Sequence, residues 1–474
     1  MNLFSIFSKF LSSIGADKVW HSSLGLKLLI LLRMIRLLGY GGTTLVLALY
    51  LHSLGFDDYD VGLFMTLTLI GDLLISFGLT YIGDGMGFRR TAAMGGALMC
   101  GSGVAFAFLE NYWLLLLASI VGVINPSANE IDPFKAIEES AVARLSTSED
   151  CNLMFAWWSM LGMLGTAASN LLTGLLVDFM YDSGFDVEDA HRVVFVGYAG
   201  IGLVKVLLCL FLSSEVEIKP HGKEEEEGGG APEINCQHST ATTPESEPLL
   251  GDNSSHSTYS ATTINSETSS THAKTPSSPP DRRHMFTPAS FTFVWKLSLA
   301  MLFDFIGSGL AQISWMVYFF AREYDVAEGT LGSATFVAGI ISSVLNLVSW
   351  PLSKAIGQVP TMVLCHTVNS VSLLMVSVPA SKYIALALFV FRIVTREIDN
   401  APRQAFISAA VSAEERTSAM GVVNIVKTVG SCAGMYATGV FAGLDKFWLA
   451  FVVAGCLKLV YNILIAAFFW RNTR

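Results

Sequence analysis

FRIVTREIDNAPRQ, residues 391–404, interrupts an apolar run with charge. It follows KYIALALFV (382–390) directly, and five of its fourteen residues are Arg, Glu or Asp. A charge at the centre of a membrane-spanning helix costs roughly 2.5–3.5 kcal/mol on insertion scales. These side chains are therefore expected to face protein, a polar cavity or the membrane surface rather than lipid.

The composition of the whole chain indicates a membrane protein. Of 474 residues, 52% are hydrophobic and 14% are charged, whereas soluble domains carry about 25% charged residues. Apolar runs recur at a length that crosses a bilayer, and no strand-like alternation of a barrel is seen, so the runs are expected to be helices. The twelve predicted spans are 26–53, 60–82, 91–109, 112–135, 153–177, 192–213, 289–320, 328–352, 358–379, 382–405, 416–442 and 446–470.

The charged stretch has a counterpart earlier in the chain. Glu130-Ile131-Asp132 aligns with Glu397-Ile398-Asp399 at an offset of 267 residues, and Thr173-Gly174 aligns with Thr438-Gly439 at an offset of 265. Self-similarity of this kind indicates a repeat. We expect an all-α membrane protein made of two six-helix bundles related by a pseudo-two-fold axis, with the solute site near the midplane between them.

The stretch between the sixth and seventh spans differs sharply in composition. It is rich in Ser, Thr, Pro, Gly and Glu and cannot bury enough apolar surface to fold, so a disordered linker is predicted. Glu245 with Leu249 and Leu250 spells an acidic dileucine pattern, a candidate site for a sorting adaptor. The predicted divisions are an N-terminal segment (1–25), a first bundle (26–213), the linker (214–288), a second bundle (289–470) and a tail (471–474).

The distribution of basic residues predicts the orientation. Arg89-Arg90, Arg282-Arg283 and the tail 471–474 fall on one side, while the connections on the other side include GFDDYD and DSGFDVEDAH, which contain no Lys or Arg. The positive-inside rule then places both termini and the linker in the cytosol. The plasma membrane is preferred to a vacuolar or endosomal membrane, and a monomer is expected.

The chain resembles the major facilitator superfamily. Beyond the twelve spans and the central linker, TYIGDGMGFRRT (80–91) resembles the family's signature loop between the second and third spans. Asp84, Gly87 and Arg89 match it, and Arg90 extends its basic end. Thr80, Gly85 and Phe88 depart from it. The resemblance implies that Asp84, Arg89 and Arg90 latch the two halves in one conformation, with a weaker or rebuilt latch where basic positions are lost.

Charged and amide side chains follow one helical face in two matching spans. Arg392, Arg396, Asp399 and Arg403 recur at helical spacing, and Pro402 predicts a break or bend. In the fourth span, Asn125, Asn129 and Asp132 share a face. A structural interpretation pairs Arg396 with Asp399 within the helix. A functional interpretation has Arg392 and Arg396 bind an anionic solute, because a guanidinium holds a carboxylate or phosphate at two points.

The functional hypothesis assigns Arg392 and Arg36 to the solute, and Glu130, Glu397 or Asp304 to protons, because a carboxylate removed from water readily takes up a proton. The resemblance implies that Lys205 and Lys458 lie on lipid-facing helices, and they are interpreted as a repeated structural pair that snorkels there. The full set of substrate or proton candidates is Arg36, Tyr40, Asn125, Asn129, Glu130, Asp132, Asp304, Gln312, Trp315, Arg392, Arg396, Glu397 and Asp399.

The sequence therefore favours a secondary active transporter of a small polar, anionic organic solute, coupled to protons. No ATP-binding loop, nucleophile elbow or HExxH motif is present, so no enzyme, cofactor, metal or nucleic-acid partner is expected. Three alternatives stay open. They are an efflux transporter for drugs or metabolites, a copper transporter using Met and Cys ligands, and a membrane sensor that binds its ligand without moving it.

Overall fold

The computed structural model describes seven stretches of the chain and seven positions between them. The stretches are 16–122, 133–147, 150–212, 286–346, 349–379, 381–396 and 415–470. The positions are Ile124, Pro126, Ile398, Asp399, Pro402, Arg403 and Phe406. The regular elements of this described part are helices, which is what apolar runs adopt when each backbone group needs a partner inside its own segment.

Eight described helices precede the linker. They are α2 (Ala16–His21), α3 (Leu24–Ser53), α4 (Asp58–Met86), α5 (Phe88–Phe108), α6 (Tyr112–Val121), α7 (Pro133–Leu145), α8 (Cys151–Asp182) and α9 (Val187–Leu210). Eight more follow it. They are α10 (Pro288–Leu310), α11 (Ile313–Tyr324), α12 (Glu328–Asn346), α13 (Ser349–Ile356), α14 (Gln358–Met375), α15 (Lys382–Thr395), α17 (Arg416–Gly443) and α18 (Phe447–Phe469).

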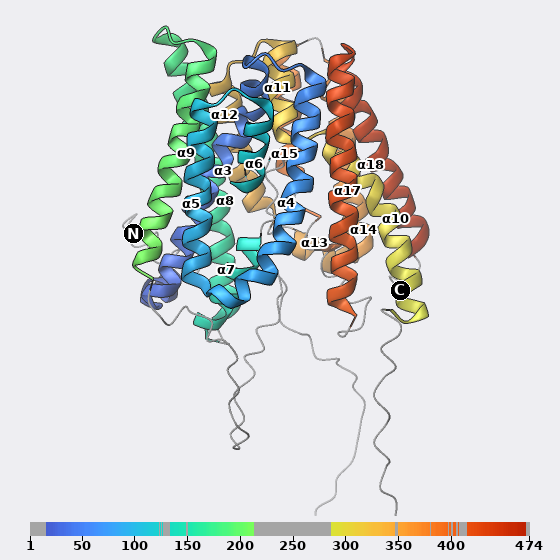
Figure 1. Ribbon diagram of the computed structural model, residues 1–474. Coiled ribbons are helices and arrows are strands. Elements are labelled where there is room, and N and C mark those ends of the chain that lie inside the picture. Colours follow the sequence, from blue (N-terminus) through green and yellow to red (C-terminus); the bar gives the residue numbers. More distant parts are fainter. Residues whose placement is uncertain are drawn as a thin grey trace, which may run out of the picture.

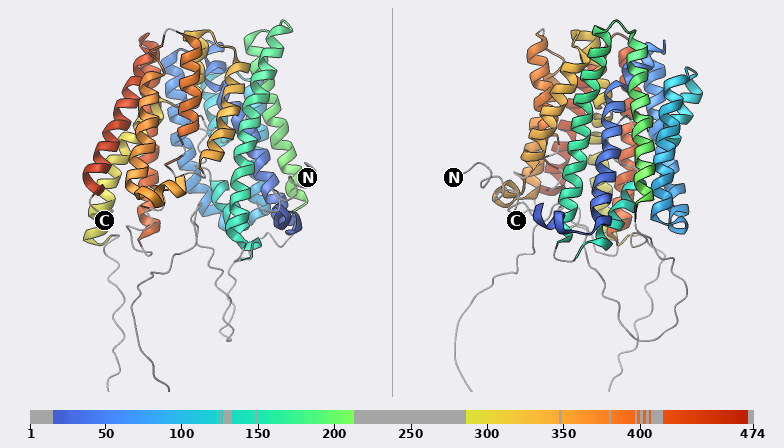
Figure 2. Two further views of the ribbon diagram at one scale, coloured as in Figure 1. Left: turned by 180° about the vertical axis from the view of Figure 1, so that it is seen from behind. Right: turned by 90° about the vertical axis from the view of Figure 1, so that its left-hand side faces the viewer.

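The long helices run roughly along a common axis, and helices of the second half lie both beside and behind those of the first half (Figure 1). Helix α2 and the last turn of α18 lie at the same end, together with the residues that flank the linker (Figures 1 and 2). We call this the terminal end. The opposite end, where α3 passes into α4 and α11 passes into α12, is called the closed end.

Seven described helices are long and apolar enough to cross a membrane. Each of the twelve predicted ranges overlaps at least one described helix. The predicted seventh span, 289–320, is broken, because α10 ends at Leu310 and α11 begins at Ile313. The predicted tenth span, 382–405, is too long, because α15 ends at Thr395. A continuous helical face through residue 403 was therefore a wrong prediction.

Two helix crossings join the halves at the closed end. Helix α4 meets α17 so closely that a Cβ placed on Gly62 would lie 2.9 Å from the Cα of Gly439. Helix α8 meets α12 in the same way, since a Cβ on Gly174 would lie 2.5 Å from the carbonyl oxygen of Glu328. The repeat aligns Gly174 with Gly439. The repeat thus places a small residue at both crossings.

A buried carboxylate reinforces each crossing. Asp58 on α4 accepts hydrogen bonds from Arg322 Nη1 at 2.7 Å and from the Tyr318 hydroxyl at 2.8 Å. Glu328 on α12 lies 2.9 Å from His191 Nε2 and accepts a hydrogen bond from the Tyr181 hydroxyl at 3.2 Å. Each set joins one half to the other, so the closed end is held by packing and by polar contacts together.

The loop that resembles the family signature contains a glycine required by the backbone. Gly87 joins α4 to α5 at φ 81° and ψ 156°, a conformation available essentially to glycine alone. Gly357, at the matching place between α13 and α14, has φ 93° and ψ 161°. Arg89 donates to the Leu210 carbonyl at 3.3 Å, and Arg90 is exposed. The side chain of Asp84 lies outside the described residues, so its part in the latch stays a prediction.

Candidate functional site

A polar cavity of about 140 Å³ lies in the second half of the chain. Its described lining residues come from α10, α14, α15, α17 and α18, from the gap between α10 and α11, and from the stretch that follows α15. Those that are charged or titratable are Asp304, His366, Arg392, Arg396, Asp399, Arg403, Lys427 and Lys458. Five of them are Arg or Lys and two are Asp, so the described lining carries an excess of positive charge.

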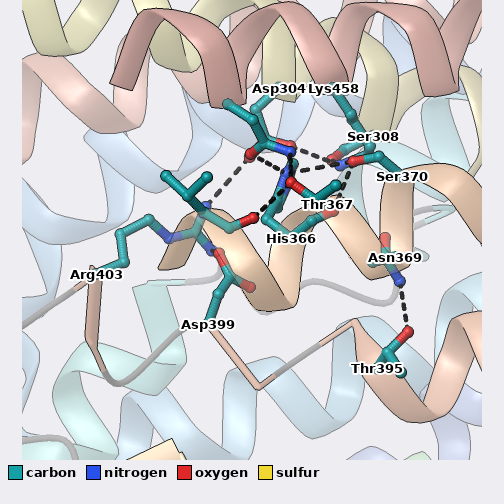
Figure 3. A network of polar contacts seen from close by, with 12 residues as sticks. Asp304, Ser308, His366, Thr367, Asn369, Ser370, Thr395, Asp399, Arg403 and Lys458 are labelled. Carbon is teal, nitrogen blue, oxygen red and sulfur yellow. Dashed lines mark hydrogen bonds and ion pairs between the residues drawn. The ribbon is translucent and has the colours of Figure 1, made fainter. Parts of the chain in front are cut away.

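Asp304 on α10 is the centre of this cluster. Its Oδ1 lies 2.5 Å from Lys458 Nζ and 2.9 Å from His366 Nε2, and its Oδ2 lies 3.2 Å from Arg403 Nη1 (Figure 3). The side chain of Asp304 is only 4% exposed. One buried carboxylate thus holds groups from α14, α18 and the segment beyond α15, which couples four parts of the fold.

Arg392 on α15 occupies the gap between α10 and α11. Its Nη2 donates to the Ala311 carbonyl at 2.7 Å, where α10 has ended and the carbonyl has no helical partner. Asn369 on α14 fixes α15 in turn, because its Nδ2 donates to the Arg392 carbonyl at 2.8 Å. Gln312 directly precedes α11 at the same gap.

The first half contains a comparable buried cluster of charged side chains. Arg36 on α3 forms an ion pair with Glu138 on α7 at 2.8 Å, and both side chains are buried. Lys205 Nζ on α9 lies 3.9 Å from Glu138. Arg36-Leu-Leu-Gly-Tyr-Gly and Asp304-Phe-Ile-Gly-Ser-Gly are 268 residues apart, so Arg36 and Asp304 hold equivalent places with opposite charge.

This arrangement corrects the interpretation of the two repeated lysines. Lys205 is 1% exposed and Lys458 is 5% exposed, so neither ammonium snorkels. Lys458 is bound instead by Asp304 and by the Ser308 hydroxyl oxygen, at 2.5 Å and 2.7 Å. A buried ammonium is tolerated where a carboxylate and further hydrogen bonds receive it.

The structure brings only part of the predicted site together. Of the candidates, those that line the cavity are Asp304, Gln312, Arg392, Arg396 and Asp399. Arg36 is in its own ion pair, with its guanidinium 5.8 Å from the Tyr40 ring centroid, and Trp315 packs against Tyr318 and Phe447. The predicted residues Arg36, Tyr40 and Trp315 are not among the described lining of the cavity. Asn125, Asn129, Glu130, Asp132 and Glu397 lie outside the described residues, as do Glu245, Leu249 and Leu250.

Several lining residues were not among the candidates. They include His366, Asn369, Arg403, Lys427 and Lys458. His366 and Lys427 are titratable residues in otherwise apolar spans, and this was a usable signal. The repeat of Lys205 by Lys458 was a second signal, but its partner Asp304 is remote in sequence.

Comparison with known proteins extends these observations. The family model "Major Facilitator Superfamily" matches residues 29–318 and 297–474. An uncharacterised membrane protein of Saccharomyces cerevisiae is 30% identical over 457 residues, which cover 94% of each chain.

Two solved structures show the same fold. A bacterial homologue of the human lysosomal transporter Spinster, in an inward-facing and unoccupied conformation, gives a TM-score of 0.65 at 14% identity, covering 95% of this chain and 98% of that one. The xylose transporter XylE from E. coli, in an inward-open conformation, gives a TM-score of 0.62 at 14% identity, covering 93% and 95%.

Proposed function

Because the chain belongs to the major facilitator superfamily, we propose that it carries a small anionic organic solute across a membrane, coupled to protons. It is an integral multi-pass membrane protein with a transporter fold rather than an enzyme. The solute class and the coupling are the parts proposed. Transport occurs by alternating access, in which the two halves rock about a central site.

The charge of the cavity lining carries the proposal. Five cationic side chains share the described lining with two carboxylates, and a bound anion would offset part of this excess of positive charge. Guanidinium groups such as Arg392 and Arg396 bind carboxylates or phosphates at two points. Helix α11 also begins at this gap, and the positive end of its dipole favours a negative ligand.

The location of Asp304 supports proton coupling. Three proton candidates came from the sequence, and Asp304 is the one whose side chain the structure describes. It lies buried among Lys458, Arg403 and His366 at the wall of the cavity. A change of one proton in this cluster alters how many charges face a bound anion, so the two binding events influence each other through electrostatics.

The contacts between halves support alternating access. The crossings at the closed end, with Asp58–Arg322 and His191–Glu328, are the contacts that have to separate when the cavity opens on that side. We place the terminal end, with both termini and the linker 214–288, in the cytosol. The transporter is proposed to act as a monomer of two bundles, 26–213 and 289–470, in the plasma membrane, with Glu245, Leu249 and Leu250 available to a sorting adaptor.

Metabolite comparison tests the solute class. Two strains of the organism that encodes this protein, here called the host, are compared, one with the gene deleted and one with the gene overexpressed. Intracellular and secreted small molecules are measured in both. The expected result is an opposite change in one anionic solute between the two strains. The direction of that change distinguishes uptake from efflux. A change confined to copper, or to neutral or cationic solutes, contradicts the proposal.

A further inference from the structure

His366 is held between an anion and an amide. The side chain is 5% exposed, and its Nε2 lies 2.9 Å from Asp304 Oδ1 (Figure 3). Its Nδ1 lies 2.9 Å from Asn462 Oδ1 on α18. A neutral imidazole has one N–H donor and one lone-pair acceptor. The number of protons on His366 therefore depends on whether both neighbours are acceptors.

The orientation of Asn462 is fixed by Thr367. The Thr367 hydroxyl donates to the Val363 carbonyl at 2.6 Å, so its oxygen offers a lone pair to other neighbours. The amide nitrogen of Asn462 donates to that oxygen at 3.0 Å. With the nitrogen used there, the amide oxygen of Asn462 has to face His366. Reversing the amide would cost the bond from Thr367 to Val363.

A second neighbour of Nδ1 is also an acceptor. Ser370 Oγ lies 3.4 Å from Nδ1, while its hydroxyl hydrogen is donated to the His366 carbonyl at 2.6 Å. Nδ1 thus faces two oxygens that offer lone pairs, and Nε2 faces a carboxylate. Both ring nitrogens need a hydrogen to make these contacts favourable. The hydrogen-bond network corresponds to an imidazolium.

We propose that His366 is the residue that binds and releases the transported proton. This assignment rests on the proposed function and adds to it the residue that carries the transported proton. Losing the proton would leave a ring lone pair facing either Asp304 or Asn462, so one of those contacts must break. His366 lies on α14, and its partners Asp304 and Asn462 lie on α10 and α18. Deprotonation of His366 would therefore loosen the attachment of α14 to one of these two helices.

The surrounding charges explain how the solute would control this proton. Asp304 also binds Lys458 and Arg403, and Arg403 lies 3.8 Å from Asp399. The Tyr461 ring lies 4.7 Å from the imidazole and completes the groups packed against it from α18. Protonated His366 is a third cation at the Asp304 carboxylate, beside Lys458 and Arg403. A third cation there is unfavourable unless an anion enters the cavity. Proton and anion would therefore bind together and leave together.

The test uses the full-length protein in liposomes that contain a pH-sensitive dye. The probe is the deproteinised anionic metabolite fraction of the host, and entering solutes are identified by mass spectrometry. The wild type is expected to acidify the lumen as an anion enters. His366→Gln keeps a donor near Asp304 but cannot carry the proton, so any anion that still enters is expected to do so without acidifying the lumen. His21→Gln, on an exposed residue of α2, is the matched control.

The outcomes separate this proposal from the proposed function. Equal acidification by His366→Gln and the wild type would overturn the role of His366 while leaving the transporter intact. A wild type that moves no anion would contradict the proposed function itself.

A second measurement does not depend on a variant. Nitrogen-15 spectra of histidine side chains are recorded for the wild type in lipid nanodiscs, with and without the anionic metabolite fraction. His366 is expected to carry both N–H groups when the fraction is present and one when it is absent, because proton and anion bind together. The same number of N–H groups on His366 in both samples would overturn the assignment.

Discussion

Replacing Asp304 with asparagine is expected to abolish transport and to lower the yield of folded protein. The substitution keeps the shape of the side chain but leaves Lys458 and Arg403 without their buried carboxylate. Removing one partner of a buried ion pair costs about 3–5 kcal/mol, which is a large part of the stability of a typical protein. Thermal unfolding followed by size-exclusion chromatography measures the loss.

Two further variants show whether unpaired charge is the cause. Asp304→Asn combined with Lys458→Met removes one of the stranded cations, so it is expected to recover part of the lost stability. Glu110→Gln is the surface control, because Glu110 is 67% exposed in its pair with Arg192 and such pairs contribute about 0–1 kcal/mol. If Asp304→Asn unfolds at the same temperature as Glu110→Gln, Asp304 does not hold the cluster together.

Replacing Gly439 with leucine is expected to prevent the closed end from closing. A Cβ at this position would lie 2.6 Å from the Asp58 carbonyl oxygen, so α17 would have to move away from α4. Overpacking of this kind costs about 1–3 kcal/mol, which shifts a two-state equilibrium roughly 5- to 150-fold. Transport should fall by a similar factor, since a conformation that the cycle requires becomes rare.

Cysteine labelling reports the same change directly. Ser431 lines the cavity, so Ser431→Cys places a thiol there. A membrane-impermeant thiol reagent added at the closed end should label this cysteine faster in the double variant with Gly439→Leu than in Ser431→Cys alone. Gly421→Leu is the matched control, because it lies on the same helix and a Cβ there meets nothing within 4 Å. Equal labelling and equal transport in the two leucine variants would show that the Gly62–Gly439 crossing does not control access.

Apolar length and internal repetition predicted the main features of the fold. Thr173-Gly174 and Thr438-Gly439 aligned in the sequence, and their glycines lie at the two crossings between halves. The break between α10 and α11 was missed because the contact that stabilises it comes from Arg392, 81 residues away from Ala311. Helix α15 ends at Thr395, whereas the prediction ended this span at residue 405, although Pro402 had indicated a bend nearby.

The site was harder to predict because its polar contacts join distant segments. Asp304, Arg392, Arg396 and Asp399 were predicted from charge within apolar runs, and they line one cavity. Lys458 was visible as a repeat of Lys205, but only the packing of α18 on α10 shows that it binds Asp304. Arg36 was expected at the solute, whereas its partner Glu138 belongs to a helix beyond the predicted fourth span.

Uptake into liposomes tests the central proposal most directly. The anion that changes most in the metabolite comparison is supplied to liposomes containing the purified protein, with and without an inward proton gradient. We expect the gradient to accelerate uptake by the wild type and Arg392→Ala to abolish that uptake. Equal uptake with and without the gradient, or full transport by Arg392→Ala, would contradict the proposal of a proton-coupled anion transporter that binds its solute in this cavity.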